Sequence, residues 1–262
     1  MISSFQKEST INLPIVEDVS KNAYPLETYP NLGPFILNAE EDLNGDGKKE
    51  IINLKTSGSY DLGFTLTVND IAISSQLTTA IDGFIIVNLD KKDTFKEIAV
   101  HTPGPSNDDE FSIYFYNGKI LYEVSRLSRW PFFPSNGIVY VSSWMGFWEK
   151  RDVYMLNPTK HILILHPQEL YNTGLQYAET TMTLPLHFER NDTSPIVMNV
   201  VTGSSIRILT ADLSPTQCPQ LSHDAWGQYG CDWYLLSTKI GILGWVRLYE
   251  LLDKVQGLTM AD

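Results

Sequence analysis

Three segments of the chain repeat one plan, and this repetition limits the possible fold more than any other feature of the sequence. Each segment has a short apolar strand, a polar connection that contains glycine, an alternating strand and a tight turn. The segments begin at Phe35, Gly83 and Gly137. Their tight turns are Asn69-Asp70, Asn117-Gly118 and Asn157-Pro158. We therefore expect similar β-sheet units that follow one another along the chain.

The second segment shows the strand pattern most clearly. Apolar side chains alternate with Ser and Tyr from Phe111 to Tyr116, and a period of two places successive side chains on opposite faces of a strand. Asn117-Gly118 then favours a two-residue hairpin, because both central residues of that turn need a positive φ angle. No segment has a convincing amphipathic helix pattern, and Gln168–Tyr177 would form two helical turns at most. The sequence therefore predicts an all-β protein.

A change in composition divides the chain. The stretch HFERNDTSP, which ends at Pro195, collects charged residues and turn formers ahead of a new set of strands. A length of 262 residues also exceeds the common size of one domain. We place the boundary near Thr180, with Met182–Leu186 as the first strand of the second domain. The expected division is residues 1–180, residues 181–255 and a frayed tail of residues 256–262.

The charge balance argues against nucleic acid as a partner. The net charge is −12 and the pI is near 4.8, whereas binding to phosphates needs clustered Lys and Arg. No stretch approaches 18 consecutive apolar residues, so we expect no transmembrane segment. The first residues, MISSFQKEST, do not contain the apolar segment of a signal peptide. This absence carries little weight, because a leader can be removed.

The loop DLNGDGKKE, Asp42 to Glu50, has the oxygen pattern of a calcium site. Ca²⁺ takes six to eight oxygen ligands, and alternate residues of a tightly wound loop can direct their oxygens inward. The candidate ligands are the side chains of Asp42, Asn44, Asp46 and Glu50 and the backbone carbonyl of Lys48. This is no EF-hand, because position 12 is Asn53 and the flanks read as strands. The alternative is a solvated turn without metal.

A second acidic loop carries Asp90, Asp93 and Glu97, but Lys91 and Lys92 interrupt it. We interpret it as a surface loop whose lysines neutralise its own acids. The stretch that follows, GPSNDDEF, places Ser106, Asp108 and Asp109 where they cap a turn through their own backbone or approach the acidic loops.

From Phe35 to Val124, the acidic loop between strands and the following Glu-Ile pairs resemble FG-GAP/VCBS repeats, the blade-like units of β-propellers. The segment KEIAVHTPGPSNDDEFSIYFYNGK also resembles repeats in exported proteins of Gram-positive bacteria, which often carry a terminal SH3-like domain. The resemblance implies propeller-like sheets, a structural calcium ion and an extracellular or cell-surface location. Three repeats are fewer than the four blades of the smallest propellers, so a sandwich or a partial ring stays open.

The C-terminal part resembles a bacterial SH3-like domain. The motifs that carry this are a strand–glycine turn–strand at Gly203, a strand with Trp233, and the closing Gly244-Trp245-Val246. The resemblance implies a small barrel that binds a cell-wall peptide, a glycan or a protein. The candidate ligand-binding residues are the aromatic Trp226, Tyr229, Trp233, Tyr234 and Trp245. For Trp233 and Trp245, packing in the barrel core is the competing interpretation.

An insertion between Leu209 and Asp232 departs from the SH3-like pattern and holds both cysteines, Cys218 and Cys231. They either form a disulfide across a 13-residue separation or are unrelated thiols, depending on the compartment.

No G-x-S-x-G, P-loop or H-E-x-x-H motif is present. We therefore predict a non-catalytic exported or surface-attached binding protein. The alternative is a cell-wall hydrolase that uses clustered carboxylates such as Asp108 and Asp109 as acid and base.

Overall fold

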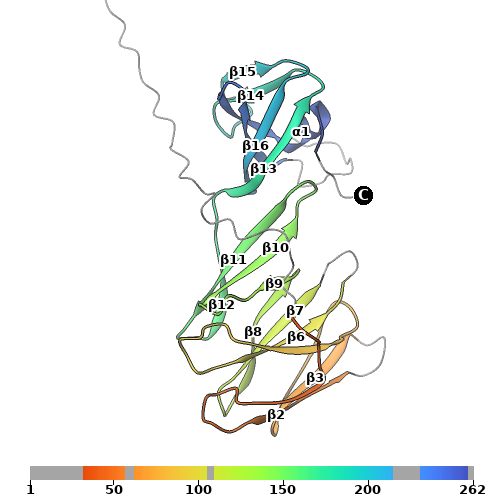
Figure 1. The fold of residues 1–262 in the computed structure, drawn as a ribbon, viewed down its shortest axis with the longest axis vertical. Coiled ribbons are helices and arrows are strands. Elements are labelled where there is room, and N and C mark those ends of the chain that lie inside the picture. Colours follow the sequence, from red (N-terminus) through yellow and green to blue (C-terminus); the bar gives the residue numbers. More distant parts are fainter. Residues whose placement is uncertain (1–31, 57–61, 105–108, 215–230, 259–262) are drawn as a thin grey trace, which may run out of the picture.

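The computed structural model describes residues 32–56, 62–104, 109–214 and 231–258. Its strands form four antiparallel sheets, three with four strands and one with seven (Figure 1). The all-β prediction is confirmed. Within the described ranges, the strand pairings close neither a barrel nor a ring of sheets.

Each of the first three sheets is a meander, in which every strand pairs with its neighbours in sequence. The first sheet contains β1 (Asn38–Glu41), β2 (Glu50–Thr56), β3 (Gly63–Val68) and β4 (Ile71–Gln76). The second contains β5 (Gly83–Val87), β6 (Glu97–Thr102), β7 (Glu110–Tyr116) and β8 (Leu121–Ser128). The third contains β9 (Pro131–Phe132), β10 (Ile138–Trp144), β11 (Glu149–Asn157) and β12 (Ile162–His166).

The three predicted tight turns all join the third strand of a sheet to the fourth, with positive φ at Asn69 (52°) and Gly118 (89°). The third unit, however, begins at β9 and not at Gly137. The two-residue strand β9 is too short to show a periodic pattern, which is why the sequence did not reveal it.

The second sheet lies between the other two, and both of its faces are buried. Ile98, Val100 and Tyr114 pack with Leu54 and Leu66 of the first sheet. On the opposite face, Ile113 and Phe115 belong to a second core that Val139 and Val141 of the third sheet complete. Strand β7 is consequently buried at every position, and each large apolar side chain in it contributes about 1.5–3 kcal/mol of burial free energy.

The last sheet has the order β15-β14-β18-β17-β16-β13-β19, so β15 and β19 are its two edges among the strands that the structure describes. Its strands are β13 (Tyr171–Thr180), β14 (Leu184–His187), β15 (Ile196–Val200), β16 (Ser205–Asp212), β17 (Trp233–Thr238), β18 (Leu243–Arg247) and β19 (Val255–Gln256). The segment Gln168–Tyr177 contains no helix; most of it forms β13, which pairs with β16. Strand β13 precedes the predicted boundary near Thr180 yet is hydrogen-bonded into this sheet.

One helix occurs in the described part of the chain, α1 (Leu248–Lys254). The sequence analysis missed it because seven residues hold too few periods for a helical pattern. Leu248 and Leu251 of α1 are buried in the core of the last sheet. None of the helical structure described here has the length and apolar character needed to cross a membrane.

Candidate functional site

The first acidic loop joins β1 to β2 and is wound by hydrogen bonds to its own side chains. Oδ1 and Oδ2 of Asp42 accept the backbone N–H groups of Gly45 (2.8 Å) and Gly47 (2.9 Å). Both glycines have positive φ angles (74° and 82°), which other residues adopt only with strain. Oδ1 of Asn44 accepts the N–H of Asp46 (2.9 Å). The side-chain oxygens therefore set the path of the backbone.

Glu50 anchors this loop from within the protein. Its side chain is buried, Oε2 accepts the backbone N–H of Leu43 (2.9 Å), and Oε1 accepts from Asn44 Nδ2 (2.9 Å). A buried carboxylate without such donors would be strongly destabilising. The sequence placed Glu50 among calcium ligands; the structure gives it a second task, which is to hold the loop against the start of β2.

The predicted calcium ligands thus fall into two groups. Asp42, Asn44 and Asp46 share one turn, and Lys48 is held there by a bond from its N–H to Asp46 Oδ1 (2.8 Å). Carboxylate and amide oxygens that accept one N–H keep further lone pairs, so these three side chains fit a hard cation. Glu50 faces inward. Across the described ranges, no three His, Cys, Asp or Glu residues form a group that could hold a metal ion. Calcium binding stays a prediction.

The second acidic loop repeats the same anchor. Glu97 is buried, and its Oε2 accepts the N–H of Leu89 (2.9 Å), as Glu50 does for Leu43. Its Oε1 lies 2.7 Å from Nε2 of His161, which the β11–β12 turn supplies from the third sheet. Asp90 and Asp93 accept N–H groups two residues ahead of themselves (3.1 and 2.9 Å), as turn-capping residues do.

Each acidic loop also joins its sheet to the next sheet. The carbonyl of Leu43 accepts the N–H of Lys96 (2.9 Å), which immediately precedes β6. The carbonyl of Leu89 accepts the N–H of Gly137 (2.8 Å), which immediately precedes β10. The two contacts are equivalent. The same loop geometry is therefore used twice to set the spacing between neighbouring sheets.

The first three sheets pack face to face and form a stack. The β10–β11 hairpin lies at the ends of the strands opposite the acidic loops, and it reaches the last sheet (Figure 1). Phe147 and Trp148, in the turn of this hairpin, are buried in the core of the last sheet. Trp148 Nε1 donates to the hydroxyl of Tyr234 (3.2 Å). Tyr171 of β13 donates its hydroxyl hydrogen to Asp152 of β11 (3.2 Å). We call residues Met145–Trp148 the plug, because they fill the core of a sheet to which they do not belong.

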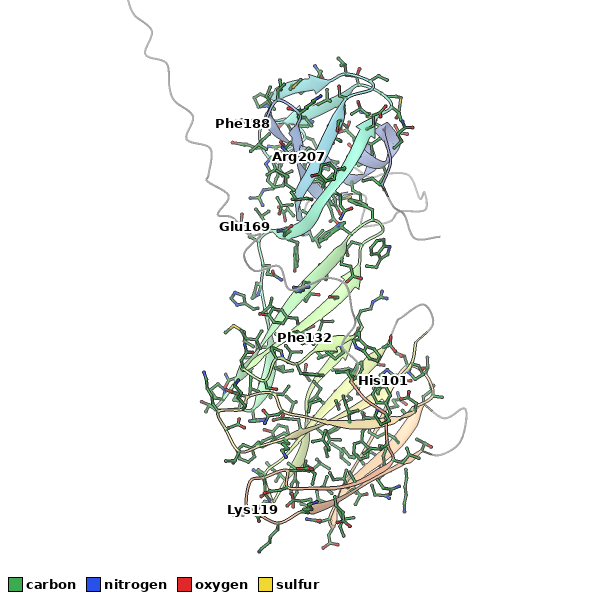
Figure 2. All side chains as sticks on the ribbon, in the orientation of Figure 1. His101, Lys119, Phe132, Glu169, Phe188 and Arg207 are labelled. Carbon is green, nitrogen blue, oxygen red and sulfur yellow. The ribbon has the colours of Figure 1, made fainter. Side chains whose placement is uncertain are left out.

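His101 (Figure 2) is the centre of a buried cluster that the sequence analysis did not identify. Its Nδ1 lies 2.7 Å from Oδ1 of Asp82 and its Nε2 lies 3.0 Å from Oδ1 of Asp109. Phe35 stacks on the imidazole ring, with centroids 4.0 Å apart. Both ring nitrogens are engaged, so His101 ties the segment before β5 to the start of β7. Asp108 and Ser106, two further candidates from the sequence, lie outside the described residues.

The aromatic residues predicted to bind ligand have different environments. Trp233 and Tyr234 are fully buried, so we leave both out of any proposed ligand surface. Trp245 is half-buried beneath the guanidinium of Arg190, whose Cζ is 5.3 Å from the ring centroid. Trp226 and Tyr229 lie outside the described residues. Cys231 is disulfide-bonded, and Cys218, the only other cysteine of the chain, is also outside them.

A partly buried polar network lies near the end of β16. Arg247 forms two hydrogen bonds to Asp192 (3.0 and 2.7 Å), which hold the pKa of Asp192 below its usual range. Arg190 pairs with Asp212 at 2.7 Å. Burial, reinforced by the charge of Asp212 and opposed by Arg247, raises the pKa of Asp232 to about 7.

Because the pKa of Asp232 is raised in the folded protein, this group lowers the stability as the pH rises. As the pH rises above the ordinary pKa of an aspartic acid, about 3.9, the unfolded chain loses this proton while the folded chain retains it. Stability is therefore lost between about pH 4 and pH 7, and the loss from this group ends near pH 7.

No protein-family model, curated protein or solved structure matches this chain. The resemblances drawn from the acidic loops and from the Gly-Trp-Val motif therefore stay expectations.

Proposed function

We propose that this chain is a non-catalytic exported or cell-surface protein that binds a cell-wall peptide or glycan, or a partner protein, through its last sheet. In this proposal the last sheet is an SH3-like barrel variant and the three meanders are propeller-like units. The three meanders have the same four-stranded order and pack face to face, which supports their description as propeller-like units.

The observation that carries the binding proposal is the exposed edge strand β15. Ile196 and Val197 of β15 are 51% and 40% exposed, and Val201, which follows the strand, is 64% exposed. An apolar edge strand offers unpaired N–H and C=O groups to an incoming chain, and proteins usually guard such edges with charges or bulges. No Lys, Arg, Asp or Glu occurs from Ile196 to Val201. An extended peptide would pair with this edge by strand addition.

The test is co-sedimentation of the full chain with purified peptidoglycan. A double variant, Val197→Lys with Val201→Lys, adds charge to the edge and should weaken sedimentation roughly tenfold or more. Ile240→Lys is the matched control, because Ile240 is 75% exposed on the β17–β18 turn and lies off the edge. Equal sedimentation of the edge variant and the control would refute the proposal, and so would a parent protein that stays in the supernatant.

The same proposal assigns a structural calcium ion to the first acidic loop, held by Asp42, Asn44 and Asp46. At millimolar calcium, an extracellular site of the usual affinity would add about 0.4–1.4 kcal/mol of stability. Calorimetric titration of the parent and of Asp42→Ala with calcium tests this assignment. Equal heats from both proteins would remove the calcium assignment.

A cell-wall hydrolase is the second candidate, favoured by Asp232 and Asp212. Asp232, whose pKa burial and the nearby charge of Asp212 raise to about 7, would serve as the acid beside a second carboxyl group. Release of soluble fragments from peptidoglycan by the parent, with loss of release in Asp232→Asn, would favour the enzyme. Binding without release would favour the binding protein.

A further inference from the structure

The chain contains Asn-Gly pairs at three places, and the structure gives them different surroundings. They are Asn44-Gly45 in the first acidic loop, Asn117-Gly118 in the β7–β8 turn and Asn136-Gly137 before β10. An asparagine that precedes glycine is chemically labile, because the next backbone nitrogen can attack the side-chain amide carbon and glycine has no Cβ to block the approach. In a folded protein, this reaction depends on whether that nitrogen is already held in a hydrogen bond.

Two of the three glycine nitrogens are held in this way. The N–H of Gly45 donates to Oδ1 of Asp42 (2.8 Å), and the N–H of Gly137 donates to a backbone carbonyl of the second acidic loop (2.8 Å). The amide nitrogen of Asn44, which would leave as ammonia, also donates to the buried Glu50 (2.9 Å). Attack at either place must first open these hydrogen bonds.

The β7–β8 turn has no such restraint on its glycine. Asn117 and Gly118 are both exposed, and the N–H of Gly118 donates no hydrogen bond within the described part of the chain. Oδ1 of Asn117 accepts the N–H groups of Lys119 and Ile120 (both 3.0 Å). Negative charge develops on this oxygen when the amide carbon is attacked, and donors placed in that way stabilise the transition state. Lys119 is exposed at one end of the molecule (Figure 2), so water reaches the turn.

We propose that Asn117 is a self-modification site. The backbone nitrogen of Gly118 loses its proton and attacks Cγ of Asn117, the side-chain nitrogen leaves as ammonia, and a cyclic imide forms. Water then breaks one of the two C–N bonds of the imide. Breakage at Cγ gives aspartate, and breakage at the main-chain carbonyl gives isoaspartate, in which the backbone continues through the former side chain. The net reaction consumes one water, releases one ammonia and needs no cofactor.

The third sheet has the same turn with a different following residue. Oδ1 of Asn157 accepts the N–H groups of Thr159 and Lys160 (both 3.0 Å), as Asn117 does for the residues two and three positions ahead of it. The residue after Asn157 is Pro158, whose ring nitrogen carries no hydrogen and cannot become the nucleophile. Asn157 therefore shares the side-chain geometry of Asn117 but should stay unmodified, which makes it an internal reference.

The modification would change a contact between the first two sheets. The β7–β8 turn lies against the first acidic loop, because a Cβ on Gly118 would come within 3.2 Å of Nδ2 of Asn44. The same amide group donates to Glu50, which anchors the loop. Both products add a negative charge beside a loop that already carries Asp42 and Asp46, and isoaspartate also lengthens the backbone of the turn. We expect the contact between the first two sheets to loosen while the last sheet is unchanged.

Peptide mapping by mass spectrometry of the full chain, incubated at mildly alkaline pH, tests the proposal. Each hydrogen bond on a reacting nitrogen that must open first slows the reaction by roughly twofold to tenfold. We expect Asn117 to be modified faster than Asn136 by this factor, and faster still than Asn44, which has two such bonds. In concentrated urea the three sites should react at similar rates. An unmodified Asn117, or equal rates at the three sites in the folded protein, would overturn the proposal.

Two variants separate the role of the nitrogen from that of the turn. Pro158→Gly supplies an N–H after Asn157, and Asn157 should then be modified at a rate close to that of Asn117. An Asn157 that stays unmodified in this variant would overturn the assignment of the Gly118 nitrogen as the selecting feature. Asn117→Asp reproduces one product and should speed hydrogen exchange in residues 42–50 by roughly twofold to fivefold, with β17 unchanged. Unchanged exchange in residues 42–50 would refute the effect on the first acidic loop.

Discussion

Replacement of Trp148 should uncouple the last sheet from the stack of three sheets. Trp148 is 1% exposed, yet it belongs to the β10–β11 hairpin of the third sheet. Its ring packs in the core of the last sheet, and its indole N–H donates to Tyr234 (3.2 Å). One side chain therefore contributes both apolar contact and a buried polar contact between two sheets whose described strands do not pair with each other.

The two contributions have different magnitudes. Truncation of a buried Trp to Ala removes its apolar contacts and leaves a cavity, at a cost of about 3–5 kcal/mol. Tyr234→Phe leaves the indole N–H without an acceptor in a dry core, which costs about 1–3 kcal/mol. Burial raises the pKa of Tyr234, so its hydroxyl is neutral at all ordinary pH values. Trp148→Phe with Tyr234→Phe removes both hydrogen-bonding groups and should cost less than the sum of the single changes.

Urea unfolding followed by circular dichroism measures each step of this double-mutant cycle. Hydrogen exchange resolved by mass spectrometry should show that strands of the last sheet open more readily in Trp148→Ala, while β7 in the middle of the stack stays protected. Trp144→Ala is the matched control. Trp144 is the last residue of β10 in the same hairpin but is 40% exposed, and we expect a loss below about 1 kcal/mol.

Two results would refute this reasoning. If Trp148→Ala costs no more than Trp144→Ala, the plug does not stabilise the last sheet. If the two Phe substitutions are strictly additive, the indole and the phenol do not interact.

Three further predictions concern the loops and the buried acids. Asp232→Asn should gain stability relative to the parent as the pH rises from 4 to 7, by at most about 4 kcal/mol. Urea unfolding at several pH values measures the difference in the free energy of unfolding between the two proteins, and a difference that does not change with pH would contradict the raised pKa. Glu97→Gln should lower the free energy of unfolding by about 1–3 kcal/mol, because an amide cannot accept from both donors; an unchanged urea midpoint would count against the anchor. Gly45→Ala should cost clearly more than Gly47→Ala in thermal unfolding. Both glycines have positive φ, but only a Cβ at Gly45 would collide with Thr94, so equal losses would show that the two acidic loops do not touch.

Much of the fold could be predicted from local chemistry. Asn117-Gly118 marked a hairpin because positive φ angles are a local requirement, and the alternation across Phe111–Tyr116 marked a strand. The order in which the sheets pack on one another could not be predicted from the sequence. Both faces of β7 are buried, and the Ser and Tyr residues that suggested a polar face pack inward, with Ser112 donating to the Tyr114 hydroxyl (3.1 Å). A pattern of polar atoms cannot distinguish solvent from a buried partner.

The candidate site was predicted in part for a similar reason. The glycines and Asx residues of the first acidic loop wind it as the sequence suggested, because these are contacts over two to five residues. The inward turn of Glu50 depends on the buried N–H of Leu43, and the partner of Glu97 is His161, 64 residues away. Trp233 and Tyr234 presented the same difficulty, since an aromatic residue in a strand suits a binding surface and a core equally well.

The connections within the three meanders explain how one repeated unit serves different purposes. At one end of the strands, the first connection of each of the first two sheets is a glutamate-anchored loop that hydrogen-bonds to the next sheet. On the other end, the second connection of the third sheet is the apolar plug, which enters the core of the last sheet. Because the strands of a meander reverse direction, these connections point to opposite ends. Changes in one loop set can therefore alter how the sheets are spaced without disturbing the attachment of the last sheet, which is the separation that the variants at Gly45 and Trp148 measure.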